Sequence, residues 1–200
     1  MAQQTEGASP PTARQLRTPA ALALADLAAI FDDLQFVLQC CERLMAELGR
    51  KKRDAVLTEA LWVAALSSYM RCFRTGDRGM SLTKDDLSAT NLKGKVLEWH
   101  KLLGKLRDFY VEGVTNPREM FSAGVAQSTE GAAQGIVITS VPQPNLDETT
   151  VQQTGRLAFE LSRVVDERIK EQQQKVFQAA EKMSVASLNQ LPAIEVSPPS

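Results

Sequence analysis

The sequence predicts a mainly α-helical bundle with a small β-hairpin before its last long helix. Apolar residues recur every three to four positions over four long stretches, which is the spacing of one helix face. None of these stretches is apolar all round, so each helix would bury one face and expose the other. Between the third and fourth stretches, glycine, proline and β-branched residues replace this period and favour strands.

The first two helices have clear start signals. Thr18 can cap a helix through its hydroxyl, and Pro19 suits the first helical position. The helical period then continues to Gly49, which ends this helix. Asp54 opens a second helix whose apolar face runs to Phe73, and a glycine-containing loop follows.

The third helix carries the most regular apolar spacing. Residues 82–88 would form one or two helical turns, and Ser88 or Thr90 would then start the third main helix, which runs to Tyr110. After Glu112 the helical pattern is broken by a segment rich in glycine, asparagine and proline.

The hairpin and the last helix follow this break. Segments 121–127 and 136–141 have β character and are expected to pair. Asp147-Glu148 place negative charge at the start of a last long helix, which suits the helix dipole.

The 200-residue length corresponds to one domain with tails. We expect a disordered tail at 1–18, a single helical-bundle domain at 19–185 and a second tail at 186–200, because both ends lack helical periodicity.

Composition excludes several classes of protein. No apolar run is long enough for a membrane span, and the N-terminus lacks the apolar core of a signal peptide, so we expect a cytoplasmic protein. Cys40, Cys41 and Cys72 form no CxxC pair, and with one histidine they predict neither a metal site nor a cofactor. Phosphate-binding loops and hydrolase motifs are also absent. The acidic pairs Asp32-Asp33 and Asp85-Asp86 indicate surface charge or caps.

The net charge of −1 hides an uneven distribution. Residues 50–107 carry thirteen bases and six acids, whereas both flanking segments are acidic. If the basic side chains converge, they form a phosphate-binding surface. The alternative is a solvated surface with cations at helix C-termini. The candidate nucleic-acid-binding residues are Arg50, Lys51, Lys52, Arg53, Arg71, Arg74, Arg78, Lys101 and Lys105.

The candidate chemical site lies late in the third helix. His100 and Arg107 are seven residues apart, so they lie two turns apart on nearly one helix face. The pair Arg107-Asp108 can tie the helix end to a neighbour, or its guanidinium can bind a phosphate. A lone histidine such as His100 beside Trp99 is more often a partly buried structural residue than a catalytic one.

The run LRDFYVEGVTNPREM around these residues resembles the motif region of the HEPN superfamily. These are small prokaryotic helical bundles, many of them ribonuclease toxins or phage-defence components. Their motif is an arginine, an adjacent polar residue and a histidine four to six residues after the arginine. Arg107 and Asp108 match this motif, but Gly113 stands where a group of these proteins has the histidine.

The resemblance implies a HEPN-like bundle, and it implies that Arg107 and Asp108 belong to a catalytic site. An active member would be a metal-independent endoribonuclease. His100 could replace the missing histidine only if a dimer brought it near Arg107 of the other copy. Glycine cannot carry a proton, so we expect an inactive ribonuclease relative.

Two function classes follow. The first is a HEPN-like protein of toxin, defence or mobile-element type that binds RNA or another nucleic acid without efficient cleavage. The second is a dimeric helical interaction protein with no nucleic-acid role. The partners expected are a second copy, RNA, or a protein partner such as an antitoxin, and no membrane.

Overall fold

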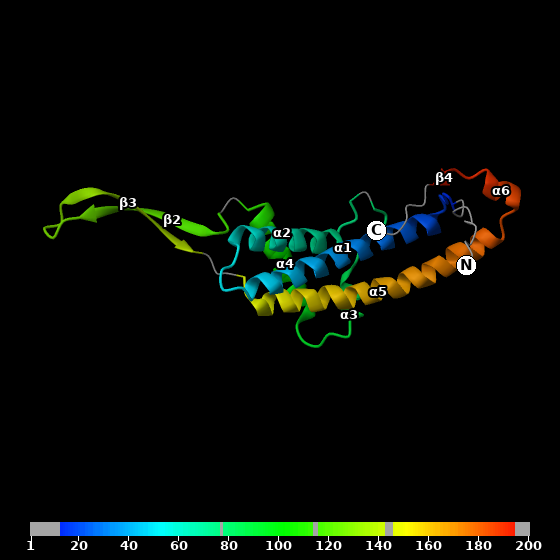
Figure 1. Cartoon of the computed structure of the whole chain (residues 1–200), viewed down its shortest axis with the longest axis horizontal. Coiled ribbons are helices and arrows are strands. Elements are labelled where there is room, and N and C mark those ends of the chain that lie inside the picture. Colours follow the sequence, from blue (N-terminus) through cyan, green and yellow to red (C-terminus); the bar gives the residue numbers. More distant parts are fainter. Residues whose placement is uncertain (1–12, 77, 114–115, 143–145, 195–200) are drawn as a thin grey trace, which may run out of the picture.

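The computed structural model describes residues 13–76, 78–113, 116–142 and 146–194. It confirms a mainly α-helical fold with a β-hairpin before the last long helix (Figure 1). The helices are α1 (Pro19–Leu48), α2 (Ala55–Arg71), α3 (Lys84–Ser88), α4 (Val96–Val111), α5 (Glu148–Glu181) and α6 (Val185–Asn189). The strands are β1 (Ala13–Arg14), β2 (Glu119–Gln127), β3 (Ala133–Pro142) and β4 (Ala193–Ile194).

The predicted helix starts of α1, α2 and α5 are confirmed by their caps. The hydroxyl of Thr18 accepts a hydrogen bond from the backbone N–H of Ala21 at 3.2 Å. The carboxylates of Asp54 and Asp147 cap α2 and α5 in the same way. Each cap satisfies a backbone donor that the first helical turn leaves without a partner.

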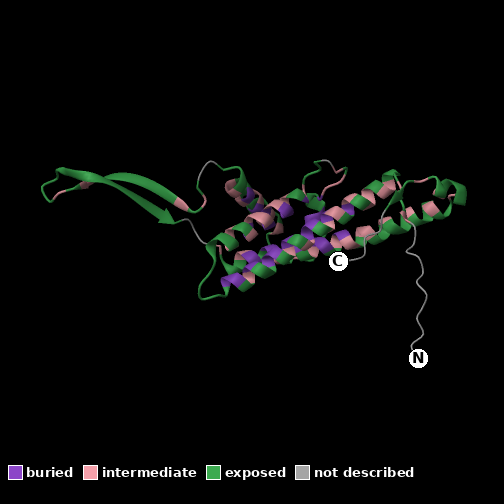
Figure 2. Cartoon of the chain, turned by 45° about the horizontal axis from the view of Figure 1, so that its top comes forward, coloured by how far each residue is buried: buried purple, intermediate pink, exposed green. Residues whose placement is uncertain are grey.

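Helices α1 and α5 form the long antiparallel pair of the bundle (Figure 1). The amide of Gln172, late in α5, donates to the carbonyl of Ala20 at the start of α1. Near the other end of the pair, a Cβ at Gly155 would lie 3.4 Å from the Cβ of Cys41, so the absence of a side chain lets the helices approach closely. Buried residues concentrate along this contact (Figure 2).

Helix α2 packs on α1, and α4 packs on α2. The core is continuous across these helices, and its fully buried members include Leu34, Leu44, Leu66, Leu103 and Leu161. Burying side chains of this size is the main favourable term for folding, at about 1.5–3 kcal/mol each.

Helix α4 begins at Val96, later than the Ser88 or Thr90 that the sequence suggests. The preceding turn is a separate helix, α3, whose capping box joins the backbone and side chain of Thr83 to Asp86. This short helix is the turn expected at residues 82–88. The hydroxyls of Ser88 and Thr90, the expected starts, donate to the carbonyls of Lys84 and Leu87 and do not cap α4.

Strands β2 and β3 form an antiparallel hairpin that projects away from the helices (Figure 1). The pairing runs from Glu119 opposite Pro142 to Gln127 opposite Ala133, with a bulge next to the turn. The predicted hairpin is thus present, and its strands are longer than the expected segments 121–127 and 136–141.

The expected tails at 1–18 and 186–200 contain ordered segments. Ala13 and Arg14 pair with Ala193 and Ile194 as strands β1 and β4, and α6 lies just before β4. Residues 1–12 and 195–200 of these tails lie outside the described residues.

Candidate functional site

Arg107 lies in the last turns of α4 with its side chain buried. Only 7% of the residue is exposed, which is exceptional for an arginine. Its Nη2 lies 2.8 Å from Oδ1 of Asp108, and its Nη1 donates to Oε1 of Glu112. Burial of a charge requires such partners, and here both come from the same stretch of chain.

The geometry around Arg107 therefore fits a structural role for the Arg107-Asp108 pair rather than the binding of a phosphate. Asp108 and Glu112 are each more than half exposed, so they reach back from the surface to the buried guanidinium. The two carboxylates already neutralise the positive charge of the Arg107 guanidinium, and a phosphate would need that charge in order to bind. The buried Nε of Arg107 has no hydrogen-bond partner within the described chain.

Gly113, at the position where the resemblance to HEPN proteins would place a histidine, follows α4 directly. A Cβ built at this position would lie 2.5 Å from the carbonyl oxygen of Phe109. Such a contact is far inside van der Waals range, so the local backbone excludes any side chain here without rearrangement. The departure from the HEPN-like pattern is thus built into the backbone conformation at this position.

His100 is partly buried against two aromatic side chains, Tyr69 on α2 and Phe73 just after it. Its Nδ1 lies 3.0 Å from the hydroxyl of Tyr69, and its ring centroid lies 4.3 Å from that of Phe73. Desolvation by burial lowers the pKa of His100, and the nearby positive charge of Lys84 lowers it further. Seven residues of helix place it about 10 Å along the axis from Arg107. Within one copy, the two side chains do not form one site.

The basic residues predicted to bind nucleic acid fall into separate groups. Arg71 and Arg78 both bind the buried carboxylate of Asp33, at 2.8 and 2.7 Å. Arg50 pairs with Glu47 at 2.7 Å. These three cations are therefore already paired with the two carboxylates of Asp33 and Glu47 on α1.

The other predicted cations are exposed and have no ion pair within the described ranges. They are Lys51, Lys52, Arg53, Arg74, Lys101 and Lys105. The group at 51–53 precedes α2 and Arg74 follows it, so the length of α2 separates them by about 25 Å. The predicted nucleic-acid-binding residues therefore do not converge on a single groove.

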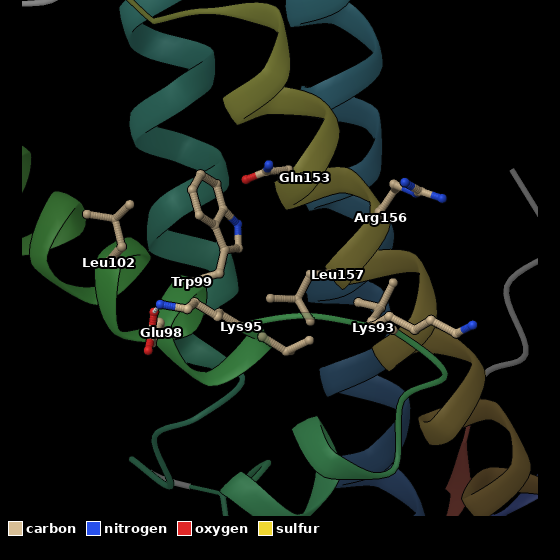
Figure 3. Close-up of a pocket in the computed structure, with 10 residues that line it drawn as sticks. Lys93, Lys95, Glu98, Trp99, Leu102, Gln153, Arg156 and Leu157 are labelled. Carbon is tan, nitrogen blue, oxygen red and sulfur yellow. Dashed lines mark ion pairs between the residues drawn. The ribbon is translucent and has the colours of Figure 1, made fainter.

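A pocket of about 480 Å³ lies between the start of α4 and α5 (Figure 3). Leu92, Trp99 and Leu157 supply apolar walls, while Lys93 and Arg156 stand at its rim. The Trp99 Nε1 is buried and has no hydrogen-bond partner among the described residues. Because this atom is closed off from solvent, a ligand in the pocket would not reach it without rearrangement.

Seven exposed large apolar side chains lie on the β2–β3 hairpin, which the sequence does not mark as a functional site. Every residue of β3 is exposed, and so are most residues of β2 (Figure 2). The available signal was the run of β-branched residues at 136–139, which favours a strand and places apolar side chains on both of its faces. The large apolar side chains exposed there are Met120, Phe121, Val125, Ile136, Val137, Ile138 and Val141.

The base of this hairpin is tied to the helices. Nη1 of Arg118 lies 2.9 Å from Oε1 of Glu59 on α2. A pocket of about 430 Å³ at the same place is lined by residues from α2, α4 and both ends of the hairpin. The ion pair and these surrounding residues define the direction in which the hairpin leaves the bundle.

Two further features bear on chemistry. No cluster of three or more histidine, cysteine, aspartate or glutamate side chains suited to a metal ion occurs in the described part of the chain. Among the described helices, none combines the length and apolar character that a membrane span requires.

Comparison of the chain with family models, with curated proteins and with solved structures finds no match.

Proposed function

We propose that this chain is a helical interaction protein whose β2–β3 hairpin docks on a protein partner. The observation that carries the proposal is the exposed apolar face of the hairpin. Ile138 pairs with Ala123 and Ile136 pairs with Val125, so these four side chains share one face with Phe121. Phe121, Ile136 and Ile138 are 61%, 73% and 75% exposed.

An uncovered face of this kind favours binding. Contiguous exposed apolar residues commonly mark a protein–protein interaction site. An isolated two-stranded ribbon is also only marginally stable in water, and a covering partner would stabilise it.

The charge pattern indicates how such a partner would be recognised. Between Glu119 and Asp147 the sequence contains one charged residue, Glu130, which lies at the turn. Recognition would therefore use apolar contacts and strand pairing rather than ion pairs.

The buried and paired state of Arg107 and the packing of His100 against aromatic rings support an interaction role over catalysis. The three free, buried thiols support placement in the reducing cytoplasm.

Site-specific photo-crosslinking in the cells that produce the protein tests this proposal. A benzophenone amino acid at Phe121 should form an adduct with one defined protein. The same group at Phe177, which is 64% exposed on α5, is the matched control and should form none. The substitution Ile138→Lys should abolish the adduct at Phe121. Equal capture at both positions, or capture that survives Ile138→Lys, would contradict the proposal.

A second candidate is a HEPN-like protein that binds RNA without cleaving it, in a toxin, defence or mobile-element setting. The observation that favours it is the exposed group Lys51, Lys52 and Arg53, which has no ion pair within the described ranges. Three phosphate contacts would make the affinity depend on salt, with a log–log slope of about −2 to −3.

RNA binding at increasing salt tests this second candidate. Neutralising Lys51, Lys52 and Arg53 to glutamine should weaken binding and flatten the salt slope. Neutralising Lys175 and Lys182, which are exposed on and just after α5, should change neither. The absence of RNA binding at low salt would remove this candidate.

The same protein should show no ribonuclease activity, because Gly113 cannot transfer a proton. Degradation of a labelled RNA above a buffer control would be the first contrary sign. Cleavage that disappears in both Arg107→Ala and His100→Ala would show that these residues form an active site after all.

A further inference from the structure

The outer edge of β3 has the properties of a pairing surface. β3 pairs with β2 on one side, and no other described strand covers its second side. Exposed edges usually carry lysine, an internal proline or a bulge that prevents pairing with another chain. β3 contains no lysine, its only proline is the terminal Pro142, and its bulge lies at Gln134 next to the turn, so the stretch from Gly135 to Val141 carries none of these features.

The sequence of this edge is nearly symmetric about Val137. Ile136 and Ile138 flank it, and the small residues Gly135 and Thr139 come next. In an antiparallel pair centred on Val137, Ile136 of each copy lies opposite Ile138 of the other. These cross-strand isoleucine pairs fall on the face that also carries Phe121 and Val125, so the apolar face continues across both copies.

Charge complementarity also favours a second copy as the occupant. A two-fold contact brings identical groups together, so any charge near the axis would repel its own mate. Residues 131–146 contain no charged side chain, and a symmetric contact along β3 meets no such repulsion. The hairpin also stands clear of the helices, so the two bundles would not collide (Figure 1).

We propose that two copies of this chain associate through antiparallel pairing of β3 with β3, centred on Val137, to form a four-stranded sheet. The inference rests on the proposed function, because both use the hairpin as the contact element. It adds the identity of the partner, which is a second copy of this chain. Three or more strands are what an independent sheet needs for stability, and the pairing supplies them.

The interface size sets the expected strength of this dimer. Stable complexes bury about 800 Å² on each partner. One strand edge of ten residues is a smaller contact than that. The dimer should therefore be weak, with a dissociation constant on the order of micromolar, and its population should depend on protein concentration.

Disulfide trapping tests the register directly. In the proposed pairing, the two copies of Val137 lie about 4.5–5.5 Å apart between Cα atoms, which suits a disulfide. Val137→Cys should therefore form a covalent dimer under mild oxidation. Thr139→Cys is the matched control on the same strand face, and its two copies would lie about 13 Å apart, so it should remain largely monomeric. The wild-type protein should form no covalent dimer, because Cys40, Cys41 and Cys72 are buried.

Light scattering over a range of concentrations gives a second, independent readout. The wild-type mass should rise toward that of two chains, and Val137→Lys should hold it at one chain, because it places two positive charges at the axis. The variant Val141→Lys carries its lysine on the same face of β3 but far from the two-fold axis. Its dimer affinity should be at least severalfold higher than that of Val137→Lys. Circular dichroism should show that all variants keep their helices.

Two results would overturn the inference. One is equal trapping of Val137→Cys and Thr139→Cys, and the other is a mass that Val137→Lys does not change. These failures are distinguishable from failure of the proposed function. An adduct of Phe121 with a different protein, without selective trapping at Val137, would leave the proposed function standing and remove the dimer. The absence of both the adduct and the trapping would remove both.

Discussion

The hydroxyl of Tyr69 lies 3.0 Å from Nδ1 of His100 and joins the middle of the bundle to α4. The Phe73 ring packs on the same imidazole, with ring centroids 4.3 Å apart. The single histidine of the chain is therefore part of an aromatic cluster between two helices, and its neutral form fits this environment.

Acidification should destabilise the protein through this cluster. Burial and Lys84 lower the pKa of His100 from its ordinary value of 6.5, so the unfolded chain takes up a proton at a higher pH than the folded one. The contribution of His100 to the free energy of unfolding should be constant above about pH 7.5. It should fall as the pH is lowered through 6.5, until the folded state is protonated as well. Urea unfolding at a series of pH values measures this.

The variant His100→Gln is the control for this effect, because it has no group that titrates in this range. Its stability should vary less than that of the wild type between about pH 7.5 and 5. An identical pH dependence in both proteins would show that another group causes it.

Removing the charge of Asp33 should destabilise the fold. This carboxylate is 5% exposed and binds both Arg71 and Arg78, which connects α1 to the end of α2 and to the loop after it. Asp33→Asn should lower the free energy of unfolding by about 2 kcal/mol, the scale of lost hydrogen bonds to charged groups. Its exposed neighbour gives the matched control, because Asp32→Asn should change stability by less than about 0.5 kcal/mol. Equal effects in chemical denaturation would contradict the assigned ion pairs.

Adjacent leucines of α4 should differ in their contribution to stability. Leu103 is fully buried in the core, whereas Leu102 is 41% exposed at the pocket between α4 and α5. Leu103→Ala should cost about 3 kcal/mol, because it loses apolar burial and leaves a cavity. Leu102→Ala should cost about 1 kcal/mol or less. Thermal or urea unfolding compares them, and a larger loss at Leu102 would mean that α4 is rotated on the bundle.

The three cysteines should be unreactive in the folded protein. Burial raises the pKa of Cys41 and of Cys72 to about 12, and it also raises that of Cys40. The thiolate is the reactive form, so a thiol reagent at neutral pH should modify them slowly. Denaturation should expose three rapidly reacting groups. Fast labelling of the native protein would contradict the burial of these positions.

The sequence predicts those parts of the fold that local chemistry determines. Caps act within three residues, so Thr18, Asp54 and Asp147 marked their helix starts correctly. The expected start of α4 was wrong because the hydroxyls of Ser88 and Thr90 bond back to Lys84 and Leu87, and α4 begins at Val96 without a side-chain cap.

The candidate site was less predictable because it depends on contacts between distant segments. Asp33 was expected to be surface charge or a cap, yet it is buried by partners 38 and 45 residues away. The basic stretch looked continuous in the sequence, but α2 separates its ends and several of its members pair with acidic residues of α1. The exposure of the hairpin also depended on packing, since its β-branched residues predict strands without saying what covers them.

The pairing of Ala13 with Ile194 has a consequence for protein engineering. Because β1 and β4 hold both ends of the described chain side by side, a short linker could join residues 13 and 194 without crossing the bundle. New termini could then open at the turn near Gly131, where no helix is interrupted. Such a circular permutant should retain the helical core while freeing the two strands of the hairpin from each other.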